Sequence, residues 1–277
     1  MRLATVRVDG GTRAAVGDDG GWVLLDETDA QELIGADGWR ERAAAALRHP
    51  ARDALDPSAF AVPMPRPAKI LCCGLNYRDH IVETGRAVPE HPTLFAKFAD
   101  TLTGPTDEIR THDTAKLDWE AELAVVIGAE VHRAGKGEAG DAILGYAVSN
   151  DISMRDWQQR TLQWLQGKAF DATTPIGPFV VTADAIDPKA GLRITCAVDG
   201  ETVQDGNTRE LVFDAADLVA YVSQITRLRP GDIILTGTPG GVALGMDDPR
   251  WLHDGDVVVT AIEGIGELRN TIRVEQA

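Results

Sequence analysis

Two glutamates separated by a single residue, Glu120 and Glu122, stand directly before the apolar run at residues 123–127. On a β-strand the side chains alternate between faces, so both carboxylates would point the same way, about 7 Å apart along the backbone. The apolar run indicates that the strand is buried. Two carboxylates at the mouth of a buried strand repel each other unless a cation lies between them.

A third acid, Asp151, follows the apolar run at residues 143–149, where a strand would end and a helix would begin. Three carboxylates, with water completing the shell, suit a hard divalent ion such as Mg²⁺ or Mn²⁺. A zinc site is not indicated, because no Cys and His share the required spacing. The alternative is that Glu120 and Glu122 lie on a solvated strand face and that Asp151 only caps the following helix.

The elements that would position these acids are mostly strands. We expect strands at residues 3–8, 14–16, 22–25, 70–73, 121–127, 143–149, 192–198, 202–204, 233–235 and 257–262. We expect helices at residues 39–48, at 214–227, and from a capping box at 153–156 to about residue 166. Many strands and few helices favour an α+β, mostly β fold.

The proline-rich segment at residues 62–67 cannot be helical and resembles a linker. We therefore divide the chain into a small N-terminal α/β unit at residues 1–65 and a larger domain at residues 66–277. The role of the smaller unit is open: it could support a dimer, cover a pocket or stabilise the fold.

The bulk properties exclude several classes of function. The 277 residues carry a net charge of −16, which argues against nucleic acid and anionic membrane as partners. The three cysteines, two of them adjacent, do not make a disulfide framework. The sequence lacks a signal-peptide pattern and an apolar run long enough to cross a membrane, so we expect a soluble, cytoplasmic protein.

Six short motifs occur together in one order and spacing. They are GLNYRDH at residues 74–80, WEAEL at 119–123, NDISMRD at 150–156, GKAFD at 167–171, PGDIILTGTP at 230–239 and GIG at 264–266. Together they resemble the catalytic domain of the fumarylacetoacetate hydrolase family, over about residues 68–275. These motif sequences are most similar to those of the bacterial branch, whose members have a single catalytic domain and a short N-terminal extension.

This resemblance implies a mixed β-sandwich or β-roll catalytic domain that holds Mg²⁺ or Mn²⁺ on Glu120, Glu122 and Asp151. It also implies assembly into a homodimer. Members of the family hydrolyse acylpyruvates, fumarylacetoacetate or diketo sugar acids, and others decarboxylate or isomerise oxo-diacids. Proteins named ureidoglycolate lyase are similar too.

Hydrolysis of a C–C bond between two carbonyls requires an electron sink and an activated water. The metal would chelate the 2-oxo acid and act as the sink. His80 is the candidate base, because its unperturbed pKa lies near neutrality, and Glu83, one helical turn further on, would orient its ring. In the resembling enzymes a His–Glu pair on a mobile lid plays this part. The alternative for His80 is a surface histidine in a polar loop.

Three further residues are candidates for contact with the substrate. Lys168 lies in an otherwise uncharged stretch and could hold an enolate or a carboxylate, although a lysine that extends along an apolar surface to solvent is the alternative. The resemblance places Thr238 in a loop that contacts the bound acid, and it implies substrate contact for Tyr77. A Gly-Thr-Pro sequence alone is only a turn.

Arg155 and Gln158 are three residues apart on the expected helix, so both could face the site. Arg155 could instead pair with Asp156 or Asp151 and support the metal ligands. Either arrangement is compatible with the spacing.

The sequence therefore favours a metal-dependent hydrolase that cleaves a C–C bond in a small diketo or acylpyruvate-type acid. A decarboxylase or isomerase of an oxo-diacid, or a lyase, would use the same metal site. A binding protein that has kept the fold without catalysis is the alternative from another class. The retention of all six candidate metal and catalytic residues counts against it.

Overall fold

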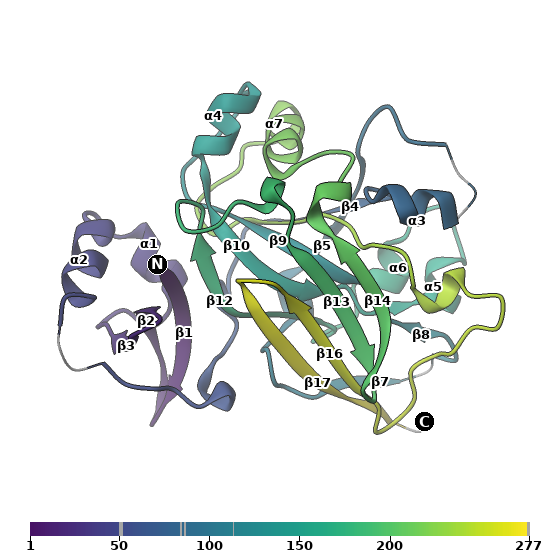
Figure 1. The fold of residues 1–277 in the computed structure, drawn as a ribbon, viewed down its shortest axis with the longest axis horizontal. Helices are drawn as coiled ribbons and strands as arrows, with labels where there is room; N and C mark the ends of the chain where they lie inside the picture. The colour runs from purple at the N-terminus through teal and green to yellow at the C-terminus, as the bar shows by residue number, and fades with distance from the viewer. Residues whose placement is uncertain (50–51, 84, 86, 113, 276–277) are drawn as a thin grey trace.

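The protein folds into two facing β-sheets with helices at their margins (Figure 1). The computed structural model describes residues 1–49, 52–83, 85, 87–112 and 114–275, apart from the side chains of His80 and Glu83. Strands dominate the architecture, so the α+β, mostly β fold class is confirmed.

The larger sheet contains ten strands, and their order explains where the candidate acids meet. In spatial order nine of them are β3 (Gly21–Leu24), β2 (Gly11–Asp18), β1 (Arg2–Val8), β12 (Thr174–Thr182), β10 (Ile143–Asn150), β9 (Ala121–Ile127), β15 (Ile233–Leu235), β4 (Ile70–Gly74) and β5 (Thr93–Lys97). The tenth, β6 (Leu102–Thr103), pairs with β12. Strands β9 and β10 are antiparallel neighbours, whereas β15 and β4 run parallel.

The smaller sheet lies in front of strands β9, β10 and β12 in Figure 1. Its order is β14 (Glu201–Asn207), β13 (Arg193–Val198), β16 (Val257–Ile262), β17 (Gly266–Glu275) and β7 (Ile109–His112). A two-stranded ribbon of β8 (Leu117–Asp118) and β11 (Ser153–Met154) lies beside these sheets.

The helices are short, and each occupies a connection between strands. The α-helices are α1 (Ala30–Gly35), α2 (Trp39–Ala46), α3 (Arg78–Glu83), α4 (Lys136–Asp141), α5 (Arg155–Gln158), α6 (Leu165–Lys168) and α7 (Ala215–Ile225). The 3₁₀ turns are η1 (Pro57–Ala59), η2 (Ala99–Thr101), η3 (Pro188–Ala190), η4 (Thr208–Glu210) and η5 (Ala243–Gly245). In the described residues, these helices all fall short of the length and apolar character that a membrane span requires.

Strand β9 is buried on both faces, which explains its almost uninterrupted apolar sequence. Leu123, Val125 and Ile127 pack in the core that includes the smaller sheet and α7. Ala124 and Val126 point to the opposite side, into the core that includes α1, α2 and β1. Because of this alternation, Glu120 and Glu122 belong to the same row as Ala124 and Val126.

Most expected strands occur where the sequence placed them, and the expected helix at residues 214–227 is α7. Asp214 begins that helix and accepts a hydrogen bond from the N–H of Asp217, at 3.0 Å. Val6 and Thr5, in β1, contact the segment that follows α2, and β1 pairs with β12 of the same large sheet. The large sheet is therefore continuous across the expected boundary near residue 65, and the division into two units stays a prediction.

The helix expected from residue 153 to about 166 is wrong. Ser153 and Met154 form β11. The hydroxyl of Ser153 donates to the backbone carbonyl of Asp151 at 2.7 Å, so Ser153 does not cap a helix. The chain then forms α5 and α6 as two separate turns. Pairing of β11 with β8 outweighs the local capping pattern.

Candidate metal centre and active site

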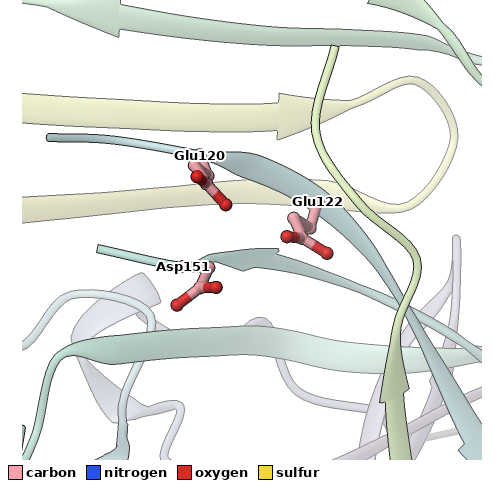
Figure 2. A group of neighbouring side chains, drawn as sticks. All are labelled: Glu120, Glu122 and Asp151. Atoms are coloured by element: carbon pink, nitrogen blue, oxygen red, sulfur yellow. The ribbon is translucent and has the colours of Figure 1, made fainter. Parts of the chain in front are cut away.

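Strands β9 and β10 bring the three candidate carboxylates together. In their antiparallel register Ser149 pairs with Glu122, and the N–H of Asp151 donates to the carbonyl of Glu120, at 2.8 Å. One oxygen from each of Glu120, Glu122 and Asp151 lies within 4.8 Å of the other two. Figure 2 shows Glu120 and Glu122 projecting from the same strand segment and Asp151 at the end of the neighbouring one. We call these three residues the carboxylate cluster.

The carboxylate cluster is buried, which rules out the solvated strand face as an explanation for the glutamate pair. Burial, and then the negative charges of Asp151 and Glu120, raise the pKa of Glu122 well above its usual value. Lys168 and the N–H of Gly237, which donates to Oε2 of Glu122 at 2.6 Å, oppose this shift. The cluster therefore carries unfavourable charge repulsion at Glu122.

Three buried cations surround the carboxylate cluster. Lys168 Nζ lies 2.7 Å from Glu120 Oε2 and 2.9 Å from Asp151 Oδ2. Lys97 forms a buried ion pair with Oδ1 of Asp151. Arg155 Nη2 lies 2.7 Å from Oε1 of Glu120. Burial lowers the pKa of Lys168, but the charges of Asp151 and Glu120 outweigh burial and raise it above its usual value.

The donor set fits a hard divalent cation. All three cluster members offer carboxylate oxygens, which Mg²⁺ and Mn²⁺ prefer. Oδ2 of Asp151 is buried and, although Lys168 is near, it accepts no hydrogen bond of acceptable geometry from the described residues. A buried carboxylate oxygen without a hydrogen bond is costly, and a metal ion directly satisfies it.

Asp118, at the end of β8, anchors Arg155 beside the cluster. Its Oδ2 accepts from Nε of Arg155 at 2.7 Å, and its Oδ1 accepts from the N–H of Ala243 at 2.8 Å. Burial would lower the pKa of Arg155, but contact with Asp118 and Glu120 raises it, so the guanidinium stays charged. Asp118 thus joins the segment that leads into β9 to the 3₁₀ turn η5.

Two buried amides hold the backbone on either side of the cluster. Oδ1 of Asn150 accepts from the N–H of Glu120 at 2.8 Å, and its amide donates to Thr260 at 2.8 Å. Gln204 accepts from the N–H of Ala121 at 2.9 Å and donates to the hydroxyl of Thr238 at 2.8 Å. These contacts tie β9 to both sheets and to the 236–239 loop.

The structure brings most of the sequence-predicted site residues to one place. Lys168 and Arg155 contact the cluster, and Arg155 Nη1 donates to Oε1 of Gln158 at 2.9 Å. Arg155 pairs with Asp118 and Glu120 rather than with the two aspartates that the sequence had suggested.

Tyr77 and Thr238 lie at the margin of the cluster. Tyr77 is fully buried, and its hydroxyl lacks a hydrogen-bond partner among the described residues. Burial, followed by the charge of Glu122, raises the pKa of Tyr77. His80 and Glu83 occupy α3, the helix that begins directly after Tyr77, but both side chains lie outside the described residues.

Sequence reasoning missed Lys97, Asp118 and Gln204. Lys97 ends the short strand β5, and Asp118 stands two residues before Glu120 in a chain rich in acids. A lysine that follows Leu94, Phe95 and Ala96 was an available signal, because charged residues are seldom buried without a partner. Gln204 had no such signal, since its role depends on the contact between the sheets.

With a cation on the carboxylate cluster, the arrangement would stabilise negative charge on a ligand. A cation on the carboxylate cluster would face two ammonium groups in a site with little access to water. An ammonium has three N–H donors. Lys168 directs its ammonium at two cluster carboxylates and can therefore offer a remaining donor to a ligand.

Comparisons with known proteins agree with this geometry. The family model of the fumarylacetoacetate (FAA) hydrolase C-terminal domain matches residues 69–273. Human mitochondrial oxaloacetate tautomerase FAHD2A is 44% identical over 216 residues, which are 77% of this chain and 69% of the relative.

Solved structures match over nearly the whole chain. Fumarylacetoacetate hydrolase from Exiguobacterium antarcticum aligns with a TM-score of 0.85 at 32% identity, covering 99% of this chain and 100% of the other. Maleylpyruvate hydrolase from Sphingobium aligns with a TM-score of 0.81 at 29% identity, with the same coverage. The similarity therefore includes the N-terminal strands as well as the region that carries the cluster.

Proposed function

Since the chain belongs to the fumarylacetoacetate hydrolase family, we propose that it is a divalent-metal enzyme that acts on a small 2-oxo acid through an enolate. We propose keto–enol tautomerisation of a short oxo-diacid, of the oxaloacetate type, as its reaction. The observation that carries the proposal is the buried carboxylate cluster with Lys97 and Lys168 against it. The 44% identity to an oxaloacetate tautomerase supports the choice of reaction.

Mg²⁺ or Mn²⁺ would be held by Glu120, Glu122 and Asp151. As a Lewis acid, the bound ion would polarise the 2-oxo group of the substrate and lower the cost of negative charge on its oxygen. Lys168 would donate to that oxygen or to a neighbouring carboxylate. Arg155 would hold Glu120 in a fixed rotamer, through the contact at 2.7 Å.

Tautomerisation of an enol to its keto form moves one proton from oxygen to carbon and consumes no water. The second carboxylate of an oxo-diacid would require a hydrogen-bond donor away from the cluster. Thr238 and Tyr77 are the described candidates at the margin of the cluster, and both are buried. Thr238 follows Gly237, whose N–H donates to Glu122, and the hydroxyl of Tyr77 lacks a hydrogen-bond partner among the described residues. His80, supported by Glu83, is our candidate for the group that carries the proton.

Hydrolysis of a C–C bond in an acylpyruvate or diketo acid is the second candidate function. Two solved hydrolases that match nearly the whole chain favour it, and so does the one-turn spacing of His80 and Glu83 on α3. In that reaction His80 would activate a water molecule. Both candidate reactions share the enolate and therefore share the cluster.

The test compares both substrates with one protein preparation. The decay of the enol form of oxaloacetate is followed by its ultraviolet absorbance, and pyruvate release from acetylpyruvate is followed with lactate dehydrogenase, each with Mn²⁺ and with EDTA. Metal-dependent acceleration of enol decay, with little pyruvate release, supports tautomerisation. Metal-dependent pyruvate release as the faster reaction supports hydrolysis, and absence of any metal-dependent reaction contradicts both.

His80→Ala separates the roles further. Loss of a general base costs roughly 10²–10⁴-fold in rate. If His80 activates water, hydrolysis should fall by that factor while Mn²⁺ affinity stays unchanged. An unchanged rate of either reaction in this variant would remove His80 from the mechanism of that reaction.

A further inference from the structure

Lys97 is a buried cation that the proposed chemistry does not yet explain. It is the last residue of β5, at the edge of the large sheet, and its side chain is completely buried against Asp151. The next residue, Phe98, is 55% exposed. A buried ammonium is costly unless an opposite charge compensates it, and at Lys97 the carboxylate of Asp151 does so.

The contacts of Asp151 show what Lys97 fixes. The backbone N–H donates to the carbonyl of Glu120 at 2.8 Å, and the backbone carbonyl accepts from Ser153 at 2.7 Å. Lys97 then occupies Oδ1 of the side chain. Oδ2, which lies 2.9 Å from Lys168 Nζ without a hydrogen bond of acceptable geometry, is the oxygen of Asp151 that a cation on the carboxylate cluster would share with Lys168.

Lys97 also changes the charge of the centre. The carboxylate cluster and Asp118 contribute four negative charges, and Lys97, Lys168 and Arg155 contribute three positive ones. The formal charge is therefore −1, and a divalent cation makes it +1. Without Lys97 the loaded centre would be neutral, and its attraction for an anionic substrate would be weaker.

We propose that Lys97 is a positioning residue that orients Asp151 and keeps the metal-loaded centre positive, so that it selects anionic oxo acids. This inference rests on the proposed metal site. Lys97 does not touch the substrate; it acts through Asp151 and through its charge. The ligand class that it favours is a carboxylate with at least one negative charge, which matches the formal charge of +1 on the metal-loaded centre.

The experiment measures two affinities that a structural role would move together. Mn²⁺ binding is titrated by electron paramagnetic resonance of free Mn²⁺, and oxalate binding to the Mn²⁺-loaded protein is titrated by calorimetry. Oxalate is a suitable probe because its adjacent carboxylates imitate the chelating end of a 2-oxo acid. In Lys97→Met we expect Mn²⁺ affinity to change by less than about threefold, because loss of the contact that orients Asp151 and loss of a repelling positive charge act in opposite directions. Oxalate affinity should fall by roughly tenfold.

Lys97→Arg supplies the complementary variant. It retains the charge and changes the shape of the donor, so we expect oxalate affinity within about threefold of the unmodified protein. If Lys97→Met does not fold, Lys97→Gln, which retains a donor without the charge, is compared with Lys97→Arg. Equal oxalate affinity in the charged and uncharged variants would overturn the proposal.

Lys69→Met is the matched control. Lys69 Nζ lies 3.2 Å from the buried carboxylate of Asp232, directly before β4 and β15 and outside the cluster, and its loss should change neither affinity. A parallel loss of Mn²⁺ and oxalate binding in Lys97→Met would indicate a structural role and contradict the proposal. Failure of the unmodified protein to bind Mn²⁺ is distinguishable, because it would reject the proposed metal site itself.

Discussion

Replacement of Glu122 by glutamine should separate the stability of the fold from its affinity for metal. The substitution keeps the size of the side chain and leaves an oxygen to accept the hydrogen bond from the N–H of Gly237. It removes one of three carboxylates whose oxygens lie within 4.8 Å of each other. We expect the variant to be more stable than the unmodified protein in EDTA and to lose the stabilisation by Mn²⁺.

The magnitude follows from the geometry of the cluster. Two unit charges at about 5 Å repel by about 3 kcal/mol at an effective dielectric constant of ~20. Lys168 offsets part of this repulsion, so we expect a gain of about 1–3 kcal/mol in the free energy of unfolding in EDTA. The gain applies whether Glu122 ionises or takes up a proton, because either response to burial has a cost.

The loss of metal response is the larger signal. Mn²⁺ at about 100 times its dissociation constant stabilises the native state by about 2.7 kcal/mol. This corresponds to a rise in Tm of roughly 5–11 °C for a protein of this size. In Glu122→Gln the rise should shrink to roughly 1 °C or less at the same Mn²⁺ concentration.

The assay is thermal and urea unfolding of both proteins, each in EDTA and in Mn²⁺. Asp232→Asn is the control, since Asp232 is equally buried but is paired with Lys69 and accepts the N–H of Arg229 at 2.9 Å. That variant should lose about 1–3 kcal/mol and keep its response to Mn²⁺. A full Mn²⁺ response in Glu122→Gln, or a large destabilisation of it in EDTA, would refute the reasoning.

Three further predictions test the surroundings of the cluster. The raised pKa of Glu122 means that the folded protein binds the proton of this carboxyl more tightly than the unfolded chain does. The free energy of unfolding in EDTA should therefore fall as the pH rises above about 4.5. Glu122→Gln should show a flatter profile of Tm against pH over the same range. Arg155→Met leaves Asp118 buried without its cation and leaves Glu120 with Lys168 alone, so urea unfolding should show a loss of about 3–5 kcal/mol. A loss below about 1 kcal/mol would contradict the ion-pair argument. In Gly237→Ala the new Cβ would lie 2.8 Å from the carbonyl oxygen of Cys73, at a residue with a φ of +99°. Both the Tm and the Mn²⁺ affinity should therefore fall. An unchanged calorimetric Mn²⁺ titration would show that the 236–239 loop is dispensable for metal binding.

The carboxylate cluster could be predicted because its pattern is local. The period of two along a strand places Glu120 and Glu122 on one face. The apolar run at residues 123–127 indicates a buried strand, and the strand expected at residues 121–127 has the bounds of β9. Asp151 follows the neighbouring strand, so the antiparallel register completes the cluster.

The rest depends on contacts between distant segments. The capping pattern at Ser153 predicts a helix, but Met154 pairs with Leu117 of β8 and converts the segment to a strand. Lys97 meets Asp151 from the far edge of the large sheet, across 54 residues of sequence. The pairing of Met154 overrides the local helix propensity, whereas the partner of Lys97 depends on the order of the strands in the sheet.

The strand order of the large sheet has a consequence for how the protein is made. Strand β9 pairs with β15, and β15 runs parallel to β4, so two neighbours in the sheet are separated by more than half of the chain. Such non-local pairing slows folding, because a long loop must close before its contacts stabilise it. During synthesis the N–H of Gly237 reaches Glu122 only after about 115 further residues have been added. The surroundings of Glu122 are therefore complete only after the last third of the chain has been made. Binding of the proposed metal should be a late event on the folding pathway.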